Sequence, residues 1–119
     1  MKVVINNCHG GFGLSEQAIE NLLERKGIEF DKVEREQKFL GASYYKAGQP
    51  HTNDNYISEY DLIEDRADED LIAVVEELGT AADGRFSELK VIEIPDDVEW
   101  YIEEYDGLEW VAEVHRTWR

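Results

Sequence analysis

Residues 2–27 read KVVINNCHGGFGLSEQAIENLLERKG, and this stretch decides the fold. It begins with three consecutive apolar residues, Val3 to Ile5, which predict a buried strand. A glycine-rich turn leads to Ser15, a residue typical of helix N-caps, and then to apolar residues at helical spacing. Lys26 and Gly27 are expected to end this helix. The stretch therefore predicts a strand, a glycine-rich turn and a helix.

The segments that follow continue the mixture of strands and loops. Residues 28–36 predict a second strand, and residues 37–55 predict a loop-rich variable insertion because glycine, proline and asparagine recur in them. Residues 56–63 are interpreted as a strand or an extended lead-in to the next helix.

The second half adds a helix and another strand. Asp68 is expected to cap a helix that Gly79 closes, and LKVIEIP at residues 89–95 predicts a largely buried strand. We therefore expect a single domain over residues 1–119 with an α/β (α+β) fold. Its predicted architecture is a single mixed β-sheet with two helices packed on it and a C-terminal β-hairpin.

The C-terminal hairpin is predicted from a turn at residues 105–107. A three-residue loop with Gly107 in the left-handed conformation places Trp100 opposite Ala112 and makes one face wholly apolar. A two-residue turn would instead place Trp100 opposite Glu113, and on this ground we prefer the longer loop.

The charge balance limits the classes of partner. The chain has 119 residues, of which 28 are acidic and 12 basic, for a net charge of −16. This balance disfavours direct binding to nucleic acid and to acidic membranes, and it favours a basic protein surface. The alternative is that the charge only keeps the protein soluble.

Features at the N-terminal end bear on the compartment. Cys8 is the only cysteine, so no intrachain disulfide is expected and a reducing compartment fits. We expect no signal peptide and no membrane-spanning helix.

The glycine-rich turn is the first candidate site, because backbone N–H groups before a helix suit phosphate or carboxylate. Its predicted ligand-binding residues are Asn7, Gly10, Gly11, Phe12, Gly13 and Ser15. The pattern is neither GxGxxG nor a P-loop, so a tight strand-to-helix turn is the alternative.

Side chains around this turn give little sign of catalysis. A cysteine-dependent phosphatase loop would carry arginine where Leu14 stands, so an inert Cys8 thiol is expected. His9, His51 and His115 show no metal-ligand spacing, and no cofactor is expected.

A second candidate is the acidic C-terminal third. In the preferred register Glu103 faces Glu109 and Glu99 faces Glu113, which predicts a compact patch of four carboxylates. Like charges opposite one another destabilise a hairpin, so a docking surface for a basic groove is one hypothesis. The alternatives are a divalent-ion site, although the spacing matches no known loop, and a solvated face that protects the sheet edge.

A third candidate is the pair Tyr44 and Tyr45, near Arg35, Lys38 and Lys46. Aromatic rings beside cations suit a nucleobase and its phosphate, whereas tyrosines that merely cover the core are the alternative.

Three stretches of the chain, KVVINNCHGGFGLS, DLIAVVEELG and VIEIPDDVEWYIEEYDGLEWVAEVHRTW, resemble a family of small uncharacterised accessory proteins of tailed bacteriophages. The resemblance covers the first 15 residues and most of residues 70–118, while residues 28–66 depart from it. It implies a phage accessory protein made in the cytoplasm of the host bacterium. It implies no catalytic residues.

Three functional hypotheses remain open. The leading one is a non-enzymatic antagonist of a host defence system that contacts a host protein through the acidic hairpin and that can form a homo-oligomer. The second is a protein that sequesters a nucleotide signal with the glycine-rich turn, Tyr44 and Tyr45. The third is an enzyme acting on a phosphorylated small molecule with Cys8 or His9.

Overall fold

The computed structural model describes residues 1–36 and 41–114. The elements in chain order are β1 (Lys2–Asn6), α1 (Glu16–Arg25), β2 (Phe30–Glu34), β3 (Ala42–Lys46), the 3-10 turn η2 (Asn53–Asn55), α2 (Glu59–Leu62), α3 (Glu69–Leu78), the 3-10 turn η3 (Gly79–Ala82), β4 (Leu89–Glu93), β5 (Trp100–Tyr105) and β6 (Leu108–Glu113). The predicted α+β class and the C-terminal hairpin are confirmed.

The predicted single mixed sheet is wrong, because the strands pair as three separate antiparallel ladders: β1 with β4, β2 with β3, and β5 with β6. The second edge of β1 is blocked by the segment before α3. There the Val4 N–H donates to the carbonyl oxygen of Arg66 at 2.9 Å. No edge of β1 is therefore free to pair with a third strand.

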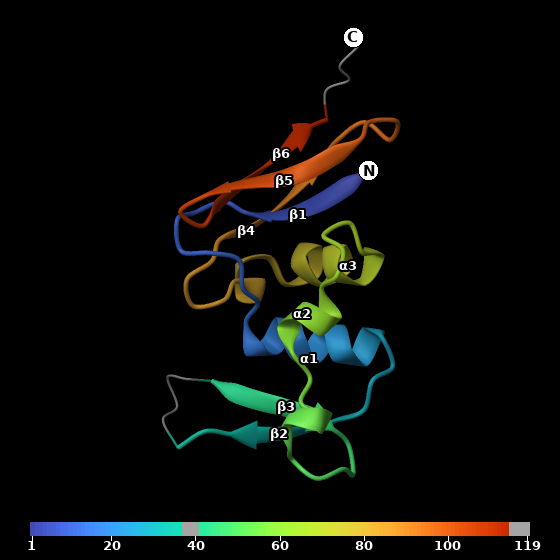
Figure 1. Cartoon of the computed structure of the whole chain (residues 1–119), viewed down its shortest axis with the longest axis vertical. Helices are drawn as coiled ribbons and strands as arrows, with labels where there is room; N and C mark the ends of the chain where they lie inside the picture. Colours follow the sequence, from blue (N-terminus) through green and yellow to red (C-terminus); the bar gives the residue numbers. More distant parts are fainter. Residues whose placement is uncertain (37–40, 115–119) are drawn as a thin grey trace.

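The three ladders form layers along the longest axis of the molecule (Figure 1). The β5–β6 hairpin lies at one end, the β1–β4 pair comes next, the helices occupy the middle, and the β2–β3 hairpin lies at the other end. The molecule is elongated, with extents of 55 × 29 × 26 Å.

The main core lies between the β1–β4 pair and the helices. Val4 from β1, Leu22 and Leu23 from α1, and Leu71 and Val74 from α3 are fully buried in it. Val3 alternates to the other face of β1, which the β5–β6 hairpin covers, and it is also fully buried. The hairpin thus builds a second apolar layer on the strand pair.

Several predicted helix ends are confirmed. The Ser15 hydroxyl accepts a hydrogen bond from the Ala18 N–H at 3.1 Å, and an Asp68 carboxylate oxygen accepts one from the Leu71 N–H at 3.2 Å. Gly79 ends α3 with a positive φ of 58°. These caps satisfy backbone groups that a helix terminus leaves without partners.

The middle of the chain differs from the prediction. Within residues 37–55, which were expected to be a loop, Ala42–Lys46 forms strand β3, and residues 37–40 lie outside the described residues. Residues 56–63, expected to form a strand or an extended lead-in, contain the short helix α2, which starts at a capping box formed by Ser58 and Asp61. Residues 42–46 form a strand because they pair with β2, although the residues around them favour turns. This pairing is a tertiary contact, so the local composition does not predict it.

The hairpin register also differs from the prediction. The turn has two residues, Asp106 with φ 50° and Gly107 with φ 87°, and Trp100 pairs with Glu113. Two successive left-handed residues in Asp-Gly are typical of the turn whose twist matches a hairpin. The register places Glu109 on the buried face, where Arg66 neutralises it.

Candidate functional site

The outer face of the β5–β6 hairpin carries exposed aromatic side chains. Tyr101, Glu103, Tyr105 and Trp110 lie on this face because they alternate with the inward pair Ile102 and Val111. Relative exposure is 43% for Tyr101, 71% for Tyr105 and 40% for Trp110. We call these four residues the aromatic face.

Glu103 holds two of these rings in place. The Tyr101 hydroxyl donates to one Glu103 carboxylate oxygen at 2.8 Å, and the Trp110 Nε1–H donates to the other at 2.9 Å. The hydrogen bond to the carboxylate raises the pKa of Tyr101, so the hydroxyl stays protonated and can donate. The result is a pre-ordered surface with one carboxylate between two rings.

The predicted patch of four glutamates does not form. Glu103 is opposite Trp110 rather than Glu109, and Glu113 is opposite Trp100 rather than Glu99. Glu109 is 8% exposed and faces inward, so it cannot touch a partner. The one-residue change of register puts Glu109 on the face opposite to Glu103, where it pairs with Glu104, and brings Trp110 onto the face of Tyr101.

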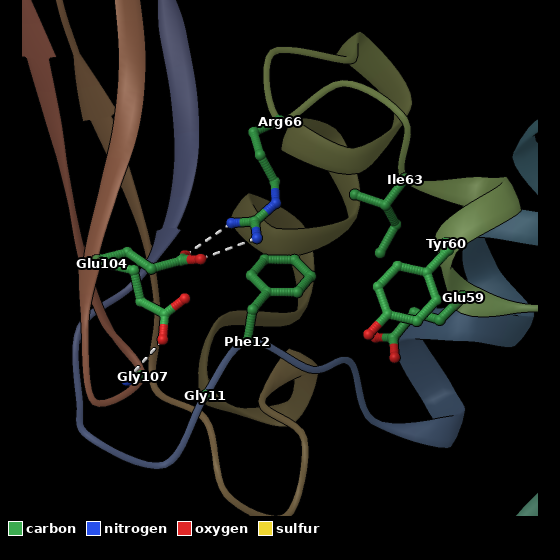
Figure 2. Close-up of a pocket in the computed structure, with 9 residues that line it drawn as sticks. Gly11, Phe12, Glu59, Tyr60, Ile63, Arg66, Glu104 and Gly107 are labelled. Carbon is green, nitrogen blue, oxygen red and sulfur yellow. Dashed lines mark hydrogen bonds and ion pairs between the residues drawn. The ribbon is translucent and has the colours of Figure 1, made fainter.

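A pocket of about 390 Å³ lies between α2 and the tip of the hairpin (Figure 2). We call it the tip pocket. It is lined by Gly11, Phe12, Glu59, Tyr60, Ile63, Arg66, Glu104, Gly107 and Glu109. The lining comes from the glycine-rich turn, α2 and its C-terminal side, and the hairpin, so the fold brings together segments far apart in sequence.

Arg66 is the best-held side chain of the tip pocket. Its two terminal nitrogens donate to both Glu109 carboxylate oxygens at 2.7 and 2.9 Å, and one of them also donates to the Val4 carbonyl oxygen at 3.3 Å. The guanidinium carbon lies 3.6 Å from the centroid of the Phe12 ring. Glu109 also accepts the Asn6 N–H at 2.8 Å. Arg66 is therefore neutralised within the protein.

Two further carboxylates face the tip pocket from opposite sides (Figure 2). Glu59 accepts the Leu14 N–H at 2.6 Å, and Glu104 accepts the Gly107 N–H at 3.1 Å. Burial raises the pKa of Glu59, although the Leu14 N–H and Arg66 oppose this shift. With all groups ionised, three carboxylates and one guanidinium give the lining a charge of −2.

Several polar groups of the glycine-rich turn bond within the protein. The Gly13 carbonyl oxygen accepts bonds from the Gly84 N–H at 3.1 Å and from the Ser87 hydroxyl at 2.6 Å. At Gly10 a Cβ atom would lie 1.7 Å from the Phe86 carbonyl oxygen, so only glycine fits. The Asn7 N–H donates to the Glu88 carbonyl oxygen at 2.7 Å. These contacts favour a structural turn; of its predicted ligand-binding residues, only Gly11 and Phe12 line the tip pocket.

The two loop tyrosines lie in β3, beyond α1 (Figure 1). Tyr44 is buried and its hydroxyl donates to a Glu20 oxygen at 3.2 Å; burial first, and then this carboxylate, raise the pKa of Tyr44. It packs edge-on against Phe30 and cannot stack on a base. Tyr45 is half-buried and stacks on His51 at 4.9 Å. Lys38, their predicted cationic neighbour, lies outside the described residues.

The remaining candidate residues have structural contacts. The Cys8 sulfur lies 3.4 Å from the Asn6 side-chain oxygen and 3.3 Å from the Phe86 carbonyl oxygen. His9 packs edge-on against Tyr105 at 6.4 Å. Within residues 1–36 and 41–114, no three or more His, Cys, Asp or Glu side chains are grouped to hold a metal ion. In the same ranges no helix is long and apolar enough to cross a bilayer. His115 lies outside them.

Sequence reasoning missed the aromatic face and Arg66. The aromatic face follows from the two-residue Asp-Gly turn. The sequence contains this turn signal, but the prediction favoured the longer loop because that loop makes one face of the hairpin wholly apolar. Nothing local marks Arg66, because its partner Glu109 lies 43 residues further along the chain.

Comparisons with models of protein families, with curated proteins and with solved structures find no match to this chain. The resemblance to phage accessory proteins therefore stays a prediction from the residues.

Proposed function

We propose that this protein acts by binding a basic protein partner through the aromatic face, without catalysing a reaction. The observation that carries the proposal is the pair of exposed rings, Tyr101 and Trp110, fixed by one carboxylate, Glu103. Tyrosine and tryptophan are enriched among residues that dominate binding energy at interfaces, and rings that are already ordered lose less entropy on binding.

The chemistry of the face selects the partner. An arginine side chain can bond to a carboxylate and also stack on a neighbouring aromatic ring, which suits the alternation of Glu103 with Tyr101 and Trp110. The net charge of −16 adds long-range attraction to a basic surface and increases the association rate.

The phage resemblance supplies the biological setting of the proposal. In that setting the partner is a basic component of a host defence system, and occupation of its surface blocks it. The nucleotide-sequestering alternative has less support, because the tip pocket is negatively charged and the glycine-rich turn bonds internally.

The test uses a photo-crosslinking amino acid at Tyr105 in the full chain, produced in bacteria that carry defence systems. We expect a basic host protein to crosslink at Tyr105 and not at Tyr56, a 42% exposed control outside both the aromatic face and the tip pocket. With the purified partner, Trp110→Ala is expected to weaken binding by a factor of about 30 or more, the effect of a hot-spot ring. Tyr56→Ala should leave the affinity unchanged, and added salt should weaken it. Equal affinity of the Trp110→Ala variant and the parent would contradict the proposal.

A further inference from the structure

We propose that the tip pocket binds an organic cation, a guanidinium or ammonium group carried on an apolar stem. This site is separate from the aromatic face, because Glu104 and Glu109 alternate to the opposite side of the hairpin. The pocket volume of about 390 Å³ falls within the range of small-molecule sites, roughly 300–1,000 Å³.

The charges of the lining select a cation. Among the described residues that line the pocket, Arg66 is the only one with a cationic side chain, and both its terminal nitrogens already bond to Glu109. Glu59 and Glu104 each accept one backbone N–H, and a carboxylate has about four acceptor positions, so each retains sites for a ligand. A phosphate would meet a lining charge of −2, whereas an ammonium or guanidinium would reduce it.

The burial of Glu59 supports this choice. Desolvation raises its pKa because the charged form lacks enough compensating contacts. A cation beside Glu59 would stabilise the charged form and lower that pKa again. Binding would thus relieve an electrostatic cost that the unliganded protein carries.

The apolar lining suits the stem of such a ligand. Phe12 and Ile63 form part of the wall, and Tyr60 stands at the edge of the pocket with 88% of its surface exposed (Figure 2). An exposed aromatic ring beside Glu59 and across the pocket from Glu104 can cover a cation with its face. The same ligand chemistry occurs in free alkylamines and in arginine or lysine side chains of a peptide.

The experiment titrates the full chain with agmatine, spermidine, an acetylated and amidated Gly-Arg-Gly peptide and, as an anion, AMP, followed by calorimetry and by NMR shifts. We expect saturable binding of at least one cation and none of AMP. Glu59→Gln and Glu104→Gln keep the side-chain shape and should each weaken binding by about tenfold, the loss of one charge-assisted contact. The control is Glu113→Gln, which removes the same charge from an exposed hairpin position outside the pocket and should leave binding unchanged.

Preference for the free amines would identify a small-molecule site, and preference for the peptide a side-chain site; both support the inference. The absence of saturable binding of every cation, parent-like affinity of both pocket variants, an equal loss in Glu113→Gln, or AMP binding in the pocket would overturn it. Tyr60→Ala is a second variant whose exposed position spares the fold, and it should also weaken binding. Trp110→Ala should leave cation affinity intact, so this result is independent of the aromatic face.

Discussion

Arg66→Met is expected to destabilise the protein strongly, because it leaves Glu109 charged and buried. The bidentate pair has side chains 22% and 8% exposed, and with Arg66 removed the Glu109 carboxylate retains one hydrogen-bond donor in the described part of the chain, the Asn6 N–H. Breaking a buried ion pair costs about 3–5 kcal/mol, whereas exposed pairs contribute about 0–1 kcal/mol. Since Arg66 is partly exposed, we expect the lower end, about 3 kcal/mol.

A double-mutant cycle isolates the interaction between the two side chains. Glu109→Gln removes the charge and keeps an oxygen for the Asn6 N–H, so its expected cost is about 1–2 kcal/mol. In the double variant no unpaired charge remains, and we expect a coupling free energy of about 2 kcal/mol. A domain stability of about 5–15 kcal/mol leaves every variant measurable.

Urea denaturation followed by tryptophan fluorescence gives the four stabilities. Lys2→Met is the matched control, because the Lys2–Glu76 pair lies at 3.0 Å with both side chains 45% exposed, and its removal should cost less than about 1 kcal/mol. A coupling below about 0.5 kcal/mol for Arg66 and Glu109 would show that water screens the pair, and the reasoning about the tip pocket would fail with it.

Two other predictions concern the hairpin turn and Glu59. Gly107→Ala should destabilise the protein much more than Gly48→Ala in a thermal melt. Both glycines have positive φ, but a Cβ at Gly107 lies 2.5 Å from the Gly11 nitrogen whereas one at Gly48 meets nothing within 4 Å; equal losses would contradict the close packing of the turn. Glu59→Gln should become more favourable relative to the parent as pH rises through the raised pKa of Glu59, because only the parent then carries the buried charge. Urea denaturation on both sides of that pKa measures the difference, and a difference that does not change with pH would contradict it.

Local elements of the fold were predictable from the sequence. Ser15 and Asp68 predict the starts of their helices because an N-cap hydrogen bond joins residues close in sequence. Val3 to Ile5 predict β1 because a strand covered on both faces is apolar throughout. The pairing of strands was not predictable. No residue near Val4 in the sequence indicates that the backbone at Arg66 will hydrogen-bond to the second edge of β1.

For the candidate sites too, local features were predictable from the sequence and long-range contacts were not. The hairpin was correctly placed, yet its register depended on whether Glu109 faced water or Arg66. The predicted register assumed that a carboxylate faces water. A guanidinium that is distant in the sequence instead stabilises the carboxylate on the buried face. Tyr44 and Tyr45 seemed equally available in the sequence, but strand alternation buries Tyr44 against α1 and leaves Tyr45 half-exposed.

The β1–β4 ladder has a consequence for synthesis on the ribosome. Lys2 pairs with Glu93, so β1 leaves the exit tunnel long before its ladder partner β4 has been translated. At roughly 5–20 residues per second this delay lasts on the order of 5 to 20 seconds. For that time an apolar strand without its ladder partner is available to chaperones and to other nascent chains, and changes that slow translation before β4 should increase aggregation without altering the finished protein's stability.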